Sequence, residues 1–567
     1  MSESASTTNY RAARNQLLQL RDNHPRAAAE FRWPDVGATF NWATDWFDVI
    51  AESNESTALW IVEEDGTEVK VSFAEMATRS DQIACWLALQ GVAKGDHVMV
   101  MLGNQVELWE VMLGIMKVGA VILPTSEMLG SGDLADRVRR GGVSHVVVNS
   151  RDTAKFDSVP GEYTRICVGP TTEGWQQFAD AYHLTPAKNA VVVSSDDPSL
   201  IYFTSGTTSK PKMVLHSQSS YPVGHLSTMY WLGLQPGDVH LAISSPGWGK
   251  HAWSCFFAPW IAQATVFIYN YSRFNPHALA EQLHRAQVTT FCAPPTVWRM
   301  LIQSDVGARP ERLREILSAG EPLNPEVISQ IENSWGLVVR DGYGQTETTA
   351  IVGNVPGSAL KAGSMGMPLP GVTVRLVDPM TGEVAEEGEI CLDLTDRPVN
   401  LMTSYHGDAE RTTIATRDGF FHTGDVAVRD KAGYLTFIGR TDDIFKSSDY
   451  KVSPFEVESI LLEHPAVAEA AVVPAPDATR LNIAKAYIHL AAGWEPNADT
   501  ALAVLRHARN GLPPYMRVRR VEFAELPKTI SGKIRRVELR EREADAASRG
   551  VTLEEEWRDD QFPALKR

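Results

Sequence analysis

Residues 202–212 read Tyr-Phe-Thr-Ser-Gly-Thr-Thr-Ser-Lys-Pro-Lys, an apolar strand end that opens into hydroxyls, a glycine and lysines. Hydroxyls and backbone N–H groups donate hydrogen bonds to phosphate oxygens, glycine lets the backbone approach closely, and lysine supplies positive charge. The spacing differs from the Gly-x-x-x-x-Gly-Lys-Ser/Thr loop of many nucleotide-binding proteins. Taken alone, the stretch fits either a phosphate-binding loop or a polar turn.

The segments around this loop alternate between short apolar runs and helical patterns. Residues 97–102 predict a strand, and residues 106–116 predict a helix. Such alternation predicts α/β layers. A turn-rich stretch at residues 355–371 ends the pattern, and residues 372–377 and 389–394 then predict the two strands of a hairpin. We therefore expect a large N-terminal α/β domain with a β-rich subdomain.

The C-terminal part begins a new pattern near Arg440. Ser453 is a predicted N-cap with Pro454 at the first helical position and Glu456 at the third, and the helix should end near Leu462. An apolar run at residues 470–473 predicts a strand. These elements predict a small α+β domain, so we divide the chain into domains at residues 1–440 and 441–567.

The composition excludes several classes of protein. The chain has 567 residues, of which 44% are hydrophobic, and a net charge of −17, which disfavours nucleic acids and anionic membranes as partners. The five cysteines are widely separated and show no CxxC spacing, so neither zinc nor a redox pair is expected. We see no run long enough to span a bilayer and no signal peptide, and we expect a cytoplasmic protein.

Five further motifs follow the loop in order along the chain. They are Ser318-Ala319-Gly320-Glu321-Pro322, Asp341-Gly342-Tyr343-Gly344-Gln345-Thr346-Glu347, Phe421-His422-Thr423-Gly424-Asp425, Gly439-Arg440-Thr441-Asp442-Asp443 and Leu526-Pro527-Lys528-Thr529-Ile530-Ser531-Gly532-Lys533. With the loop, this ordered set resembles the adenylate-forming superfamily, which includes acyl-CoA synthetases, luciferases and the adenylation domains of peptide synthetases. The resemblance covers nearly the whole chain.

The resemblance implies an ATP-dependent acid:CoA ligase, which forms an acyl adenylate and then a thioester, with ATP, Mg²⁺ and coenzyme A as cofactors. Joining a carboxylate to the α-phosphate brings two anions together, so the site needs cations and a fixed geometry. The resemblance assigns catalytic roles to Lys533, Thr346 and Glu347, with the Lys533 ammonium reaching the acid and α-phosphate oxygens. Glu347 is the expected Mg²⁺ ligand. In isolation, Lys533 and Glu347 would also fit ordinary surface residues.

The same resemblance assigns nucleotide binding to residues of five motifs. Asp425 should accept hydrogen bonds from the ribose hydroxyls, Arg440 should contact ribose or phosphate, and Asp442 resembles the hinge of a mobile C-terminal domain. Salt-bridged surface residues are the alternative for Arg440 and Asp442. The nucleotide-binding set is Thr204, Ser205, Gly206, Thr207, Thr208, Lys212, Gly320, Glu321, Pro322, Asp341, Gly342, Tyr343, Gln345, Asp425 and Arg440.

The resemblance implies that the acid lies along two stretches of the chain, Asp341 to Glu347 and Gly247 to His251. The residues in question are Gly247, Trp248, Gly249, Lys250 and Gly344. Acetate-specific relatives carry tryptophan at the position matched by Gly344, so glycine is expected to leave room for a larger acid. The chain looks most like the medium-chain acyl-CoA synthetase branch, and straight-chain, branched and aromatic acids all stay open.

Three departures from the family pattern bear on the acceptor. Ser209 and Asp449 stand where relatives commonly have glycine, and Lys451 stands where arginine is common. Since Asp449 lies in a segment that borders the pantetheine path in relatives, its charge could repel an anionic acceptor. The expected partners are a small carboxylic acid and CoA, and a homo-oligomer is compatible with the sequence.

Two other functions compete with the CoA ligase. The first is an acyl-adenylate-forming enzyme that delivers to a carrier protein in trans, because only 34 residues follow Lys533, which is 567 − 533. The second is a nucleotide-binding protein that has lost catalysis. The presence of Glu347, Asp425, Arg440 and Lys533 disfavours that second alternative.

Overall fold

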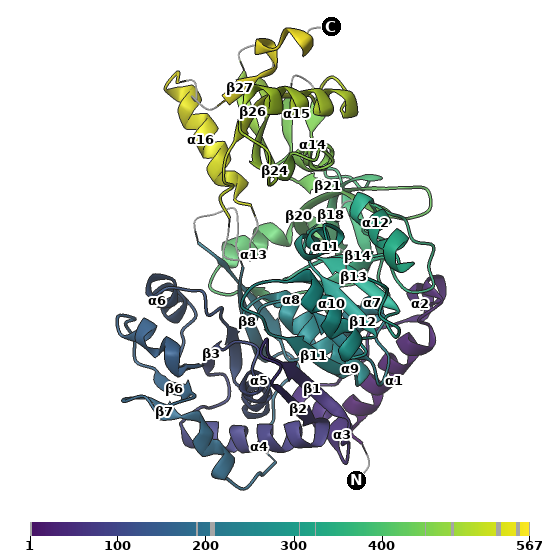
Figure 1. Cartoon of the computed structure of the whole chain (residues 1–567). Coiled ribbons are helices and arrows are strands. Elements are labelled where there is room, and N and C mark those ends of the chain that lie inside the picture. The colour runs from purple at the N-terminus through teal and green to yellow at the C-terminus, as the bar shows by residue number, and fades with distance from the viewer. Residues whose placement is uncertain are drawn as a thin grey trace. The chain divides into compact units, whose positions relative to one another are not determined.

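The computed structural model describes residues 3–188, 191–204, 210–304, 307–321, 323, 325–447, 450–477, 481–528, 534–551 and 556–565 (Figure 1). The contacts divide the chain into two units. Unit 1 consists of Met1–Val374, Leu392–Phe421 and Gly433–Leu435, and unit 2 of Arg375–Cys391, His422–Ala432 and Thr436–Arg567. The predicted fold class, a large α/β part and a smaller α+β part, is confirmed, whereas the boundary at residue 440 stays a prediction.

Unit 1 contains an eight-stranded sheet in the order β19-β9-β8-β4-β3-β5-β6-β7. Its strands from β8 to β7 pair in parallel, and both faces of such a sheet must be covered by other elements. The strands are β3 (His97–Met101), β4 (Val121–Pro124), β5 (His145–Asn149), β6 (Thr164–Val168), β7 (Gln176–Gln177), β8 (Pro198–Thr204), β9 (Lys212–Ser217) and β19 (Ser404–Tyr405).

The predicted strand at residues 97–102 and helix at 106–116 correspond to β3 and α5 (Val106–Val118). Every residue of α5 from Leu108 onward is buried, which is why the apolar pattern is so dense. The helix ends at Gly119, whose φ of 73° lies in the left-handed region that favours glycine. Unit 1 also contains the helices α3 (Asp48–Ala51), α4 (Phe73–Leu89), α6 (Ser131–Arg140) and α13 (Ala409–Ala415).

The second sheet of unit 1 has nine strands in the order β16-β15-β14-β13-β12-β10-β11-β1-β2. Its central pairs are parallel, and β2, β15 and β16 join antiparallel. The strands are β1 (Thr57–Val62), β2 (Glu68–Ser72), β10 (Val239–Ala242), β11 (Thr265–Tyr269), β12 (Thr290–Ala293), β13 (Glu315–Ala319), β14 (Arg340–Gln345), β15 (Thr349–Gly353) and β16 (Met367–Pro368).

Helices cover this second sheet and supply its core, as Figure 1 shows for α10, α11 and α12. Leu283 of α10, Trp298 of α11 and Ile331 of α12 are buried against Phe267 and Phe291 of the strands. The remaining helices of unit 1 are α1 (Ala5–Gln19), α2 (His24–Glu30), α7 (Ser220–Leu232), α8 (Gly249–Ala252), α9 (Ala258–Ala262), α10 (Pro276–Arg285), α11 (Pro295–Ile302) and α12 (Pro325–Trp335).

Most residues of a four-stranded sheet belong to unit 2, although one end of each strand falls in unit 1. The sheet has the order β17-β18-β20-β21 and is formed by β17 (Val374–Val377), β18 (Glu387–Asp393), β20 (Phe420–Arg429) and β21 (Leu435–Arg440). Since β17 and β18 are neighbours, the hairpin predicted at residues 372–377 and 389–394 is confirmed. A two-stranded hairpin follows, formed by β22 (Phe445–Ser447) and β23 (Tyr450–Val452).

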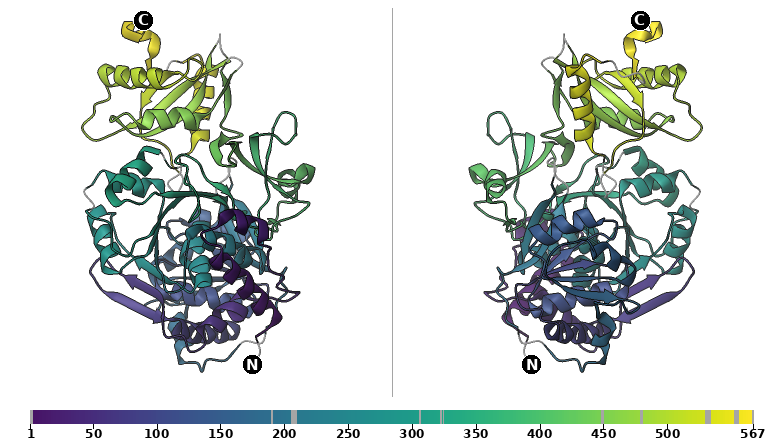
Figure 2. Two further views of the ribbon diagram at one scale, coloured as in Figure 1. Left: turned by 90° about the vertical axis from the view of Figure 1, so that its right-hand side faces the viewer. Right: turned by 90° about the vertical axis from the view of Figure 1, so that its left-hand side faces the viewer.

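The second sheet of unit 2 is sandwiched between helices (Figure 2). Because side chains alternate along a strand, Val472 of β24 packs with α14 and α15, and Ala471 and Val473 pack with Leu539 of α16. The elements are α14 (Pro454–Leu462), β24 (Val467–Asp477), β25 (Leu481–Leu490), α15 (Ala498–Gly511), β26 (Val518–Phe523), α16 (Arg536–Ser548) and β27 (Glu556–Arg558). The predicted cap of α14 is confirmed, since Ser453 Oγ accepts the backbone N–H of Glu456 at 3.2 Å.

Candidate functional site

The ends of the predicted phosphate loop lie opposite each other on two strands. Thr204, the last residue of β8, pairs in antiparallel register with Lys212, the first residue of β9. The intervening Ser205, Gly206, Thr207, Thr208 and Ser209 lie outside the described residues. The strand pair thus fixes both ends of the loop.

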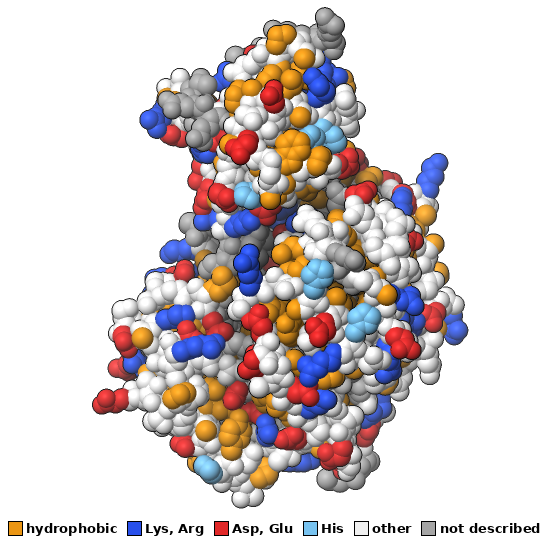
Figure 3. Space-filling view, viewed as in Figure 1, with side chains coloured by type: hydrophobic (Ala, Val, Ile, Leu, Met, Phe, Trp, Pro, Cys, Tyr) orange, Lys and Arg blue, Asp and Glu red, His pale blue; other side chains and the backbone are white. Residues whose placement is uncertain are grey.

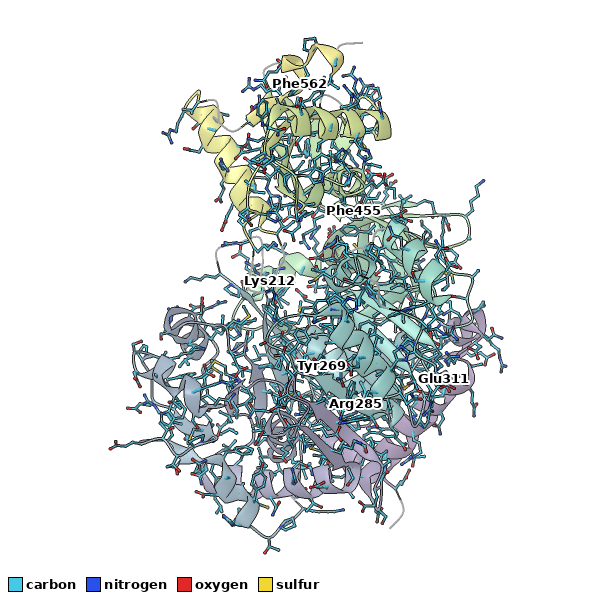
Figure 4. All side chains as sticks on the ribbon, in the orientation of Figure 1. Lys212, Tyr269, Arg285, Glu311, Phe455 and Phe562 are labelled. Carbon is cyan, nitrogen blue, oxygen red and sulfur yellow. The ribbon has the colours of Figure 1, made fainter. Side chains whose placement is uncertain are left out.

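Lys212 lies beside the predicted magnesium ligand. Its Nζ is 3.9 Å from Oε1 of Glu347 and 5.2 Å from the centre of the Tyr405 ring. Tyr405 Oη donates a hydrogen bond of 2.9 Å to the same carboxylate oxygen. Glu347 is only 7% exposed, so this carboxylate is held in place by a hydroxyl and an ammonium group rather than by water. Figure 4 labels Lys212.

The turn between β14 and β15 positions Thr346 and Glu347. Gln345 donates its backbone N–H to Thr348 Oγ1 at 3.0 Å, which closes the turn. His216 of β9 donates from Nε2 to the carbonyl oxygen of Thr346 at 2.7 Å. Burial lowers the pKa of His216 to about 4, so this imidazole is neutral near pH 7 and serves as a fixed support. The turn is therefore held by its own hydrogen bond and by His216 of β9, a strand that lies far from it in the sequence.

The two predicted adenine motifs lie on neighbouring parallel strands. Ser318 pairs with Asp341, and Ala319 pairs with Gly342, so the carboxyl end of β13 lies beside the first half of β14. Ligands of open parallel sheets bind at such ends. Gly320 follows β13 with a φ of 107°, and Glu321 is half-buried, whereas Pro322 lies outside the described residues. The structure thus brings both motifs together.

Asp341 is the most unusual carboxyl group of this region. Burial raises its pKa to about 8, although the backbone N–H groups of Gly342 and Leu323 act in the opposite direction. At the next residue, a Cβ atom would lie 2.2 Å from the ring of Trp231, so only glycine fits at position 342. The half-buried Tyr343 follows. The adenine motif is therefore packed directly on a buried tryptophan.

The predicted acid-binding stretch packs against the same turn. A Cβ atom at Gly249 would lie 3.1 Å from Thr346 Oγ1, and one at Gly247 would lie 2.5 Å from the backbone nitrogen of Ser126. Gly247 also has a φ of 91°, which favours glycine. Trp248 is half-buried at the start of α8. These close approaches place the stretch next to the turn that carries Thr346.

Lys250, in the same stretch, carries a buried ammonium group. Its Nζ has no hydrogen-bond partner among the described residues. Its charge acts on two buried neighbours: burial and, to a smaller extent, the charge of Lys250 together lower the pKa of His240 to about 3. Burial raises the pKa of the Cys255 thiol to about 12, against the effect of Lys250. An unpaired buried cation is costly unless a ligand compensates it.

Gly344 corrects one expectation from the sequence. A Cβ atom there would lie 1.9 Å from the carbonyl oxygen of Thr349 and 2.8 Å from the ring of Trp253. The pairing of β14 with β15 is irregular between Tyr343 and Gly344, which brings the two backbones close. The direction in which a side chain would leave residue 344 is therefore filled, and the glycine does not open space there.

In unit 2 the structure brings together three predicted residues. The guanidinium of Arg440 donates to Asp425 Oδ1 and to Asp442 Oδ1, both at 3.1 Å. Asp425 is only 6% exposed. The ribose, phosphate and hinge predictions thus fall on one ion-pair cluster. Lys533 and Asp449 lie outside the described residues, and Lys451 is exposed on β23.

Sequence reasoning missed Tyr405, His216 and Tyr221. Tyr405 reaches the site because β19 pairs with β9, Tyr405 opposite Val214. Tyr221 accepts a hydrogen bond of 2.9 Å from Trp253 and packs on His216 with ring centres 4.3 Å apart. No local pattern marks Tyr405, whereas the histidine four residues after the loop was a usable signal for His216.

Family comparisons agree with this geometry. The family model described as AMP-binding enzyme matches residues 47–406, and the one described as AMP-binding enzyme C-terminal domain matches residues 456–533. The chain is 40% identical to 4-hydroxybutyrate–CoA ligase 1 of Metallosphaera sedula over 529 residues, which cover 91% of this chain and 93% of the relative.

Two more relatives extend the comparison. The acyl-coenzyme A synthetase ACSM4, mitochondrial, of Rattus norvegicus is 39% identical, with 89% of this chain and 90% of the relative covered. The crystal structure of the anthranilate CoA ligase AuaEII in complex with anthranoyl-AMP has a TM-score of 0.80 and 27% identity, covering 90% of this chain and 99% of that chain. In the part of the chain that the structure describes, no helix is long and apolar enough to cross a membrane.

Proposed function

The chain belongs to the AMP-binding enzyme family, and from this premise we propose that it is an ATP-dependent acid:CoA ligase. In the first step, a carboxylate oxygen bonds to the α-phosphorus of ATP, the bond to the β-phosphate breaks, and pyrophosphate leaves. In the second, the CoA sulfur bonds to the acyl carbon, AMP leaves, and the thiol proton passes to solvent. The products are acyl-CoA, AMP and pyrophosphate.

The buried carboxylate of Glu347 is the observation that carries this proposal. It lies beside the strand end that carries Lys212, is fixed by Tyr405, and follows the turn that carries Thr346. Mg²⁺ prefers carboxylate and phosphate oxygens, and Glu347 offers such an oxygen next to the predicted phosphate loop. When bound, the ion supplies positive charge against the ATP phosphates.

The remaining residues divide the work of binding and orientation. Thr204 and Lys212, with residues 205–208 between them, would hold the phosphates, and Gly320, Glu321, Pro322, Gly342, Tyr343 and Gln345 would surround the adenine with Asp341. Asp425 would accept hydrogen bonds from the ribose hydroxyls, and Arg440 would orient the Asp425 carboxylate. Lys533 would bring its charge to the acid and the α-phosphate during the first step. We retain Asp442 as the proposed hinge and residues 441–567 as the mobile domain.

The acid is proposed to be medium-chain, branched or aromatic. The names of the relatives support this range, since one activates 4-hydroxybutyrate and another is an anthranilate CoA ligase. Because Gly344 opens no space of its own, the stretch from Gly247 to Lys250 is the better candidate for selecting the acid. The Lys250 ammonium, which is buried and has no hydrogen-bond partner within the described part of the chain, favours an acid or acyl adenylate that brings a polar group to it.

Delivery to a carrier protein in trans is the alternative for the second step. The departures at Asp449 and Lys451 are what keep this alternative open. We further propose a cytoplasmic location, a role in fatty acid metabolism and a homo-oligomeric assembly. Gel filtration with light scattering and fractionation of cells that produce the tagged protein would test assembly and location.

The decisive experiment follows AMP formation with ATP, Mg²⁺ and a panel of acids from acetate to decanoate, with 4-hydroxybutyrate and benzoate, with and without CoA. We expect steady AMP release only with CoA and with an acid longer than propionate or an aromatic one. Glu347→Gln is the matched inactive control, because it keeps the size of the side chain and removes its charge. Pyrophosphate exchange without any effect of CoA would favour the carrier-protein alternative, and no exchange with any acid would refute the ligase.

A further inference from the structure

A cavity lies beside Lys212, whose ammonium group also approaches the carboxylate of Glu347. It has a volume of about 410 Å³ and is lined by Arg140, Lys210, Pro211, Lys212, Met213, Tyr405, His406, Gly407, Asp408 and Arg411. A volume of this order is typical of small-ligand sites. All its lining residues belong to unit 1. They lie at the end of α6, just before and at the start of β9, and from the end of β19 to the start of α13.

The charge of this cavity is opposite to that of the protein. Its lining contains four Lys or Arg side chains, Arg140, Lys210, Lys212 and Arg411, and one acidic side chain, Asp408, so the balance is 4 − 1 = +3. The whole chain carries −17. Blue side chains gather on this face around the positions of α6 and α13 in Figure 3. Local positive charge in a strongly acidic protein indicates a site for an anion.

Neighbouring groups hold these cations in place. Arg140 donates to the carbonyl oxygen of Pro211 at 2.8 Å, and its guanidinium lies 5.8 Å from the centre of the Phe203 ring. Arg411 donates to Asp408 Oδ2 at 3.0 Å and lies 6.0 Å from the centre of the Tyr405 ring. Their side chains keep 23% and 29% exposure, so both can still reach a ligand. A preorganised pair of guanidinium groups suits the oxygens of phosphate.

We propose that this cavity binds a phosphate anion that the ligase reaction supplies, either the pyrophosphate released in the first step or the 3′-phosphate of CoA. The inference rests on the proposed function, because that function supplies both anions. Lys212 and Tyr405 border the cavity and also contact Glu347, so pyrophosphate that leaves the ATP site meets the cavity without crossing the protein. Retention of the anion there would make the enzyme sensitive to product.

Equilibrium dialysis with labelled pyrophosphate tests this, while a saturating α,β-methylene analogue of ATP fills the nucleotide site. We expect one further pyrophosphate to bind the unaltered protein, and Arg140→Gln and Arg411→Gln each to weaken this binding about tenfold. Arg139→Gln is the matched control, because Arg139 is the neighbouring residue on α6, shares Asp136 with Arg140 and does not line the cavity. It should change nothing.

Competition identifies the source of the anion. If CoA displaces the label and dephospho-CoA does not, the cavity holds the CoA 3′-phosphate; if neither displaces it, the cavity holds pyrophosphate. No binding beyond the nucleotide site, or binding that both substitutions leave intact, would overturn the proposal. Binding of the ATP analogue is measured in the same samples, so a chain that binds no nucleotide would refute the ligase function itself and is distinguished from failure of the cavity.

Discussion

Tyr405 and Glu347 are 58 residues apart in the chain, yet Tyr405 Oη donates a hydrogen bond of 2.9 Å to Glu347 Oε1. The carboxylate is 7% exposed, so this hydroxyl replaces water that would otherwise solvate it. The bond also fixes the direction in which the other lone pairs of the carboxylate point. Tyr405 therefore acts on the proposed metal ligand as a positioning residue.

Tyr405→Phe removes this hydroxyl and little else. A hydrogen bond to a charged group contributes about 1.5–3 kcal/mol, so we expect kcat/KM for AMP formation to fall about 10- to 100-fold. The Mg²⁺ concentration for half-maximal rate should rise as well, which loss of folding alone would not produce. The matched control is Tyr163→Phe, which removes a hydroxyl that donates to the carbonyl oxygen of Val159 at 3.0 Å. An unchanged Mg²⁺ dependence in the Tyr405 variant would show that the hydroxyl does not position the ligand.

Local signals explain which elements the sequence predicted well. The helix at Val106–Val118 follows from a dense apolar pattern that stops at Gly119, and α14 follows from the Ser453 cap. The Tyr405 contact depends instead on the pairing of β19 with β9, which no window of sequence reveals. Likewise, the irregular pairing of β14 with β15 brings the backbone of Thr349 against Gly344, where the sequence alone suggested open space. Both features depend on the register between strands, which local sequence patterns do not predict.

Asp341→Asn should stabilise the unliganded protein at neutral and alkaline pH. Burial raises the pKa of Asp341 from 3.8 to about 8, so the folded state resists ionisation that the unfolded chain accepts. The stability that the neutral carboxyl contributes is complete below pH 4 and is lost as the pH rises toward 8. We expect the variant to gain about 2–4 kcal/mol at pH 8 and nothing at pH 4.

Thermal unfolding of both proteins between pH 4 and pH 8 measures this difference. Asp65→Asn is the control with the opposite sign, because hydrogen bonds from Thr67 lower the pKa of Asp65 in the same unit. That substitution should lower the unfolding temperature at pH 8 and have no effect well below pH 4. A constant offset between Asp341→Asn and the unaltered protein at every pH would contradict the ionisation argument.

Lys250→Met should also raise the stability of the unliganded protein. The Nζ atom is buried without a hydrogen-bond partner among the described residues, and replacing such a group by an apolar side chain of similar length removes a desolvation cost. We expect a gain of about 1–3 kcal/mol in the free energy of unfolding. If Lys250 serves the acid, KM for the acid should rise at the same time with little change in KM for ATP.

Lys250→Gln separates charge from polarity. Glutamine removes the charge but leaves a buried polar group, so its unfolding temperature should lie between those of the Met variant and the unaltered protein. Equal acid KM values in all three proteins would remove Lys250 from the substrate site. Loss of stability in the Met variant would show that the ammonium has a compensating partner.

The buried lysine of unit 2 should behave in the opposite way to Lys250. Lys485 is fully buried and lies 2.8, 2.7 and 2.9 Å from carboxylate oxygens of Glu522, Glu543 and Glu556. Burial works to raise the pKa of Glu556, but Lys485 outweighs it, so this pKa lies below its ordinary value. Lys485→Met leaves three buried carboxylates without their common cation, which should cost about 3–5 kcal/mol.

Hydrogen exchange followed by mass spectrometry locates that loss. Peptides from β24, β25 and β26 should exchange faster in Lys485→Met, while peptides from β3 to β5 keep their protection, because the two groups of strands belong to different units. Lowering the pH toward 4 should restore part of the protection, since protonation removes the repulsion among the carboxylates. Lys446→Met is the control, because Lys446 is exposed on β22 in the same unit. Equal exchange in both variants would mean that the three carboxylates are neutral or solvated without Lys485, and that the ion cluster is not what holds α16 and β27 on this sheet.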